Sequence, residues 1–125
     1  MQFNRLQFVA LIKVGKMMSL ADGVVQRSEV KTMCDVVASF GVSNSDFESM
    51  LSSADDMEPA IAISIITTMN ESQKRYICAF LGAIIAIDGD VDDKEMALWG
   101  LLTALCDLPK MSILQALAIM NDEIK

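Results

Sequence analysis

The chain has 125 residues, a net charge of −7 and no histidine, and 53 % of its residues are hydrophobic. This length is typical of one domain, so we expect residues 1–125 to form a single core. An acidic surface repels phosphate backbones, so we expect no binding to DNA or RNA. The lack of histidine removes the commonest general base, the usual catalytic triads and the histidine-containing zinc sites.

The uncharged segments are too short to cross a membrane. The longest are residues 59–70 and 76–87, with 12 residues each, whereas a membrane-spanning helix needs about 20 apolar residues. Lys13 and Lys16 interrupt the stretch that would form the apolar region of a signal peptide. We therefore expect no membrane span and a location in the cytoplasm.

Apolar residues recur at helical spacing along nearly the whole chain. For example, Phe47, Met50, Leu51 and Ala54 lie at i, i+3, i+4 and i+7. Together with start and stop signals, this spacing predicts an all-α domain of seven helices, which are residues 3–21, 27–40, 44–53, 58–69, 71–87, 93–106 and 109–122.

Individual residues mark where these helices begin. Pro59 and Pro109 suit the first turn of a helix, and Asn70 with Gln73 has the spacing of a capping box before the fifth helix. Residues 61–66 also alternate like a β-strand, but a single strand has no partner with which to form a sheet. The fourth segment is therefore predicted as a helix.

The fifth predicted helix is apolar on nearly all sides from Tyr76 to Ile87. Such a helix belongs at the buried centre of a domain. One side consists of small residues that allow neighbouring helices to approach closely, namely Ala79, Gly82, Ala83 and Ala86. We expect almost complete burial of its large apolar residues, which are Ile77, Phe80, Leu81, Ile84 and Ile85.

The sequence carries no pattern typical of an enzyme. Cys34, Cys78 and Cys106 have no CxxC spacing and no histidine to activate them, and all lie in apolar helical patterns. We expect them to be reduced packing residues rather than nucleophiles or disulfide partners. Glycine-rich phosphate loops are absent as well. The sequence therefore predicts a non-enzymatic protein without catalytic or cofactor-binding residues.

Two segments that lie 66 residues apart share the pattern D-G-x-V-x-x-x-E. The first spans residues 22–29 and the second spans residues 88–95. Each segment follows an apolar helix and precedes an amphipathic one. An internal duplication explains this arrangement, with repeat halves at about residues 8–53 and 74–122.

A duplicated turn of this kind in a seven-helix domain resembles the TerB-like family, which is named for the tellurite-resistance protein TerB. Its members carry an A-D-G-x-[IV]-x-x-x-E stretch, whose first position is kept by Ala21 and changed at Ile87. The resemblance covers about residues 8–122 and implies an association with tellurite resistance and stress responses. It also implies divalent-metal binding at the acidic motif positions, which here are Asp22, Glu29, Asp88 and Glu95.

The second acidic turn is richer in carboxylates than the first, because it also contains Asp90, Asp92 and Asp93. It is not an EF-hand loop, since the sixth position is Asp93 rather than glycine and the twelfth is Trp99 rather than glutamate. A site built from carboxylates would take calcium or magnesium with weak affinity. The candidate metal ligands are Asp22, Glu29, Asp88, Asp90, Asp92 and Glu95.

Helix capping explains some of the same residues without a ligand. With Asp92 as the N-cap of a helix, Glu95 falls at position N3 and completes a capping box. Capping does not explain Asp22 and Asp88, which follow the C-terminal ends of helices, where the macrodipole disfavours an anion. Two functions therefore stay open. One is a TerB-like module that binds a divalent cation, and the other is a protein–protein or self-association module whose acidic turns are structural.

Overall fold

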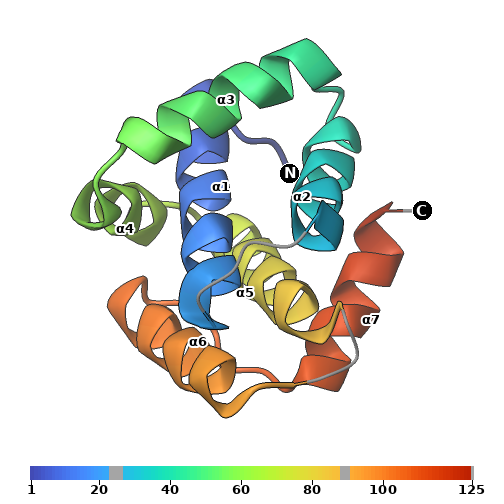
Figure 1. Ribbon diagram of the computed structural model, residues 1–125. Helices are drawn as coiled ribbons and strands as arrows, with labels where there is room; N and C mark the ends of the chain where they lie inside the picture. Colours follow the sequence, from blue (N-terminus) through green and yellow to red (C-terminus); the bar gives the residue numbers. More distant parts are fainter. Residues whose placement is uncertain (23–26, 88–90, 125) are drawn as a thin grey trace.

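Seven α-helices and one short 3-10 turn form the described part of the protein, which is residues 1–22, 27–87 and 91–124 of a computed structural model (Figure 1). The side chains of Asp22, Glu123 and Ile124 lie outside this description. In chain order the elements are α1 (Arg5–Ser19), η1 (Leu20–Asp22), α2 (Arg27–Ala38), α3 (Asn44–Asp56), α4 (Pro59–Thr67), α5 (Glu71–Ala86), α6 (Asp93–Leu105) and α7 (Ile113–Ile124). Because no strand occurs among these residues, the predicted all-α class is confirmed.

The predicted start of α5 is confirmed by a complete capping box. The Gln73 amide donates to the Asn70 side chain at 2.8 Å, and the Asn70 amide donates to Gln73 Oε1 at 3.1 Å. Pro59 occupies the first turn of α4, as predicted. The strand-like alternation of residues 61–66 is therefore part of a helix.

The predicted start of the last helix at residue 109 is wrong, because α7 begins at Ile113. Ser112 and Gln115 form a reciprocal cap at this point. The Gln115 amide donates to Ser112 Oγ at 3.1 Å, and the Ser112 amide donates to Gln115 Oε1 at 2.8 Å. This cap satisfies amides that the first helical turn leaves without partners, so it fixes the helix start after Ser112 rather than at Pro109.

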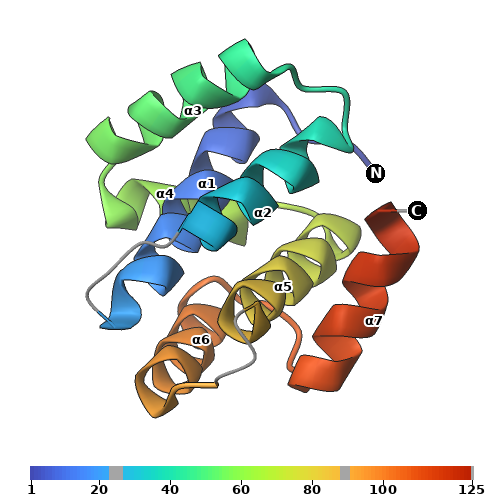
Figure 2. The same cartoon turned by 45° about the vertical axis from the view of Figure 1, so that its right-hand side comes forward.

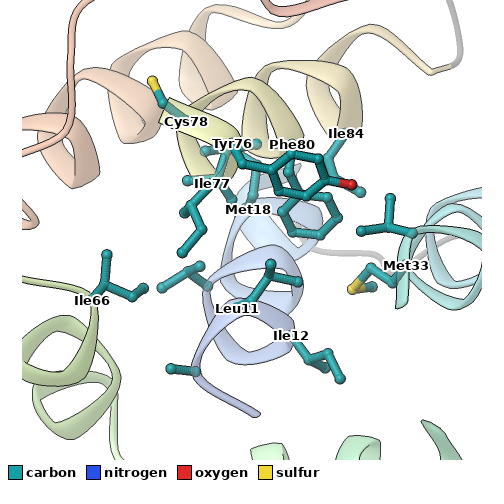
Figure 3. Close-up of a cluster of buried hydrophobic side chains, with 14 of the residues drawn as sticks. Leu11, Ile12, Met18, Met33, Ile66, Tyr76, Ile77, Cys78, Phe80 and Ile84 are labelled. Carbon is teal, nitrogen blue, oxygen red and sulfur yellow. The ribbon is translucent and has the colours of Figure 1, made fainter. Parts of the chain in front are cut away.

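Helix α5 lies at the centre of the fold and contacts α1, α6 and α7 (Figure 1, Figure 2). The five large apolar residues that were predicted to be buried in α5 are all at most 1 % exposed. Side chains of α1 meet those of α5 in this core, and Met33 of α2 and Ile66 of α4 point into it (Figure 3). The prediction of a buried central helix is therefore confirmed.

Helix α1 is a second central helix. Four consecutive residues, Val9, Ala10, Leu11 and Ile12, are at most 2 % exposed, because α3, α4 and α5 all pack against α1. Despite this apolar interior, none of the described helices combines the length and the hydropathy that a bilayer crossing requires.

Two glycines allow the central helices to approach their neighbours. A Cβ atom on Gly82 of α5 would lie 2.6 Å from the Cβ atom of Ala116 on α7 and 3.0 Å from the Trp99 ring on α6. A Cβ atom on Gly15 of α1 would lie 2.9 Å from the Phe80 ring on α5. Close packing requires both glycines, as was predicted for Gly82.

The two halves of the chain repeat the same helix start at an offset of 66 residues. Asn4 and Gln7 form a capping box at α1, as Asn70 and Gln73 do at α5. The two boxes also touch, because Gln73 Nε2 donates a hydrogen bond to Gln7 Oε1 at 3.3 Å. Contact between equivalent residues is the arrangement expected where a two-fold axis passes.

The ends of α2 and α6 correspond in the same way. Each helix is followed by a residue in the left-handed region, which is Gly41 with φ 91° after α2 and Asp107 with φ 56° after α6. The next amide bonds back to the carbonyl five residues earlier, at 3.3 Å in the first half and 2.9 Å in the second. Both helices therefore end in a Schellman-type turn at equivalent positions.

The duplication predicts that one rotation relates the two halves. In a crystal structure of the protein, α1 and α2 should superpose on α5 and α6 by a pseudo-two-fold rotation, with equivalent residues offset by about 66. Superposition of the backbone atoms of the two helix pairs checks this expectation. Helix pairs that cross at unrelated angles would contradict the duplication.

Substitution of Leu81 by alanine should lower the free energy of unfolding by about 2–5 kcal/mol, because it leaves a cavity in a tightly packed core. Urea denaturation followed by circular dichroism measures this loss. The matched control is Leu114→Ala on α7, where Leu114 is 79 % exposed and the change should stay within about 0.5 kcal/mol. A loss below about 1 kcal/mol for Leu81→Ala would argue against the central position of α5.

Candidate functional site

The first acidic turn leads from η1 into α2. Glu29 lies in the first turn of α2 and is only 6 % exposed. Asp22 ends η1, but its side chain and residues 23–26 lie outside the described part of the chain. Of the two ligands predicted in this turn, Glu29 is therefore the one whose side chain the structure places, and it is directed inward.

The second acidic turn leads from α5 into α6. Asp92 is the N-cap of α6, and its Oδ1 atom accepts a hydrogen bond from the Lys94 amide at 2.6 Å. Glu95 lies in the first turn of α6 and is also 6 % exposed. The predicted ligands Asp88 and Asp90 lie outside the described residues.

The capping role predicted for Asp92 is confirmed, although its hydrogen bond differs from the prediction. The carboxylate accepts from the amide at position N2, which is Lys94, instead of the amide at position N3, which is Glu95. A carboxylate has two oxygens and about four lone-pair sites. Capping through Oδ1 therefore occupies one of the two oxygens of Asp92.

Glu29 and Glu95 are the buried acidic residues of the described chain. Removing a carboxylate from water is costly unless polar groups or a cation compensate, and neither of these residues is without a partner. The first helical turn contributes part of the compensation, because the macrodipole favours an anion there by about 0.3–1 kcal/mol. A glutamate that only capped its helix could stay in solvent. Burial of both residues therefore indicates a shared, inward-facing feature of the two turns.

Within the described ranges, no three carboxylate or thiol side chains lie together in a group that could hold a metal ion. Three of the six candidate ligands have side chains outside those ranges, namely Asp22, Asp88 and Asp90. Glu29, Asp92 and Glu95 are thus the candidate ligands whose burial is known, and the complete ligand set stays a prediction.

Sequence reasoning missed an ion pair between a buried lysine of α5 and an exposed aspartate that follows α6. Lys74 is 5 % exposed, and its Nζ atom lies 3.2 Å from Oδ2 of the exposed Asp107. The burial of Lys74 could have been predicted from helical spacing. Lys74 lies three residues before Ile77 and four before Cys78, so it shares the face of these two buried residues.

The cysteines near this ion pair are not activated. Burial raises the pKa of the Cys106 thiol to about 11, although the nearby Lys74 ammonium acts in the opposite direction. Burial also raises the pKa of Cys78, whose Sγ atom lies 3.2 Å from the Pro109 carbonyl oxygen. Both thiols therefore remain protonated near neutral pH, in a form that is a poor nucleophile.

Two adjoining hollows share Lys110 and Met111 in their linings. One has a volume of about 310 Å³ and is lined by Arg75 and Asp122 among others. The other has a volume of about 280 Å³, is mainly apolar and has Trp99 in its wall. The sequence did not indicate either hollow, because each is formed by segments that meet only in the folded chain.

The described residues define the chain as an all-helical protein with a buried glutamate in the first turn of both α2 and α6. No family model and no curated protein matches it. Among solved structures, it is similar to the crystal structure of the protein of unknown function PG1108 from Porphyromonas gingivalis W83. The two share 36 % sequence identity with a TM-score of 0.86, and the match covers 98 % of each chain. The chain belongs to the same family as this protein.

In the native protein at pH 8, iodoacetamide should modify Cys78 and Cys106 at least about tenfold more slowly than the half-buried Cys34, because buried thiols are protonated and inaccessible. Mass spectrometry of the digested protein measures the three rates. Unfolding in urea is the control and should make the rates similar. Equal rates in the native protein would contradict the packing role of these two cysteines.

Proposed function

We propose that the protein is a non-enzymatic binding module that holds a divalent cation at its acidic turns. The observation that supports this proposal is the burial of Glu29 and Glu95 at equivalent positions of the two turns. Both glutamates already have an interaction partner, and a divalent cation would add to the compensation for the cost of burying their carboxylates. It also explains why both turns begin with an aspartate at the end of a helix, where an anion is otherwise disfavoured.

The second turn is the stronger candidate of the two. Asp88, Asp90 and Asp92 precede Glu95 there, whereas Asp22 and Glu29 are the acidic residues of the first turn. Carboxylate oxygens are the ligands that calcium and magnesium prefer. Since the negative charges of the second turn repel one another when no cation is present, we expect cation binding to stabilise this turn most.

The resemblance of these turns to the TerB-like motif supports the same residues. In that family the acidic positions are associated with divalent metal, and the corresponding residues here are those at the start and the end of each motif. Tellurite and stress responses are the cellular setting that this resemblance suggests. The proposal includes no catalytic step, because the thiols of Cys78 and Cys106 are kept protonated by burial.

Addition of 10 mM calcium or magnesium should raise the melting temperature by roughly 3–8 °C, because a cation that binds only the folded turn stabilises it. For a dissociation constant of about 1 mM, mass action gives a stabilisation of about 1.4 kcal/mol. Differential scanning calorimetry measures the shift. Sodium chloride at the same ionic strength is the control for general screening of the −7 charge.

Two variants separate specific binding from screening. Asp88→Asn should lose the part of the shift that is specific to divalent cations and keep the part caused by screening. Glu48→Gln is the matched control, because it removes one negative charge from an exposed position on α3 and should respond like the wild type. Equal shifts in the wild type and in Asp88→Asn would show that the turns only cap helices.

A further inference from the structure

Helix α6 is apolar on its outer surface as well as on its buried one. Trp99 and Leu102 are buried against the rest of the fold. The residues on the opposite side are exposed and uncharged, and they form what we call the outer face of α6: Ala97, Gly100, Leu101, Ala104 and Leu105. A surface helix usually presents charged residues to water, and α6 lies at the edge of the molecule in both views (Figure 1, Figure 2). The outer face therefore has the composition of a contact surface.

Gly100, in the middle of the outer face, is not required by the fold. A Cβ atom there would meet nothing within 4 Å, whereas one on Gly15 or Gly82 would meet side chains at 3.0 Å or less. Glycine weakens a helix relative to alanine, because it leaves the unfolded chain more freedom. Small residues allow another helix to approach closely. Gly100 lies between Ala97 and Ala104 on this face, so the three small residues leave room for another helix to approach.

The same surface carries a protrusion and a hollow. Leu101 and Leu105 protrude on one side of Gly100 and are 54 % and 49 % exposed. The mainly apolar hollow of about 280 Å³ lies on the other side, between Trp99 and Met111, and Lys110 also lines it. A two-fold symmetric interface requires a patch that is complementary to itself. A leucine protrusion beside an apolar hollow meets this requirement.

Charge favours a second copy of the chain as the occupant. Residues 96–106 carry no charge, and neither do residues 59–70, which include all of α4, a helix in contact with α6. Since each copy has a net charge of −7, two copies repel one another least where their surfaces are neutral. Charges of both signs lie beside this face, namely Lys110 in the lining of the hollow and Asp93 and Lys94 at the start of α6, so the face offers no patch of one sign to an acidic or basic partner. A membrane-surface helix usually carries several lysine or arginine residues beside its apolar side, whereas α6 carries one, Lys94.

We propose that the outer face of α6 joins two copies of the chain in a two-fold symmetric dimer. Leu101 of each copy occupies the apolar hollow beside Gly100 of the other. Helix α6 has 13 residues and is about 20 Å long, so it offers less than the roughly 800 Å² per partner of a standard interface. A small interface of this kind is typical of a weak, transient dimer, so we expect a dissociation constant on the order of tens of micromolar. This inference does not depend on cation binding.

Sedimentation velocity from about 5 to 500 µM protein in the presence of EDTA tests the proposal, because this range brackets the expected dissociation constant. The wild type should show a reversible monomer–dimer equilibrium. Leu101→Glu should weaken dimerisation at least about tenfold, because it removes the leucine contact and moves a carboxylate from water into a hollow whose lining is mainly apolar. Gly100→Gln should weaken it similarly, since a long side chain prevents the close approach of the helices.

Control measurements keep the test independent of folding. Leu114→Glu places the same charge at an exposed leucine of α7 and should leave the dissociation constant unchanged. Gly100→Gln should not lower the melting temperature of the monomer, because glutamine favours a helix more than glycine does.

Four outcomes would overturn the proposal. The first is a wild type that is monomeric at 500 µM, and the second is a dimer unaffected by Gly100→Gln. The third is an equal loss of dimer for Leu114→Glu and Leu101→Glu. The fourth is binding of the wild type to phosphatidylcholine vesicles that Leu101→Glu abolishes, because it would assign the face to a membrane.

Discussion

Helices α1 and α5 cross in direct contact, and each of the other helices packs against at least one of them. The contact is close because Gly15 of α1 has no side chain where the Phe80 ring of α5 lies, and a Cβ atom there would be 2.9 Å from that ring. Protein interiors have no free space to absorb such an overlap. If α1 and α5 were forced apart, the helices packed around them and the turns that follow their C-terminal ends would therefore be displaced as well.

The acidic turns depend on this central pair. Each turn begins where a central helix ends, and α2 or α6 then returns along the pair. The first turn of each of these helices carries one buried glutamate, Glu29 or Glu95. The two turns thus share a buried glutamate and differ in charge, because the second turn carries more aspartates than the first.

The relationship to the Porphyromonas gingivalis protein concerns the whole domain, because the match covers 98 % of both chains. Family membership therefore supports the arrangement of all seven helices that the structure describes, while the function of the two proteins is a separate question. Both of our proposals involve α6. Asp92 caps its N-terminus, Glu95 lies in its first turn, and its outer face follows along the same helix. The two proposals rest on different residues, so the failure of one would leave the other intact.

Local signals in the sequence determined most of the helices. The capping box of Asn70 and Gln73 fixed the start of α5, and its apolar character on all sides fixed its burial. These features could be predicted because they depend on residues within one or two helical turns. The start of α7 was predicted wrongly. Pro109 suits the first turn of a helix, but the reciprocal cap between Ser112 and Gln115 places the start at Ile113.

The tertiary structure decided what each local feature faces. The sequence placed Glu29 and Glu95 in acidic turns, but their burial depends on the helices packed across from them. The same holds for the glycines. Gly82 and Gly100 both lie inside helices, yet a Cβ atom would collide with a neighbouring helix at Gly82 and meet open space at Gly100. Helical spacing shows which side of a helix a residue occupies, whereas only the assembled fold determines what lies on that side.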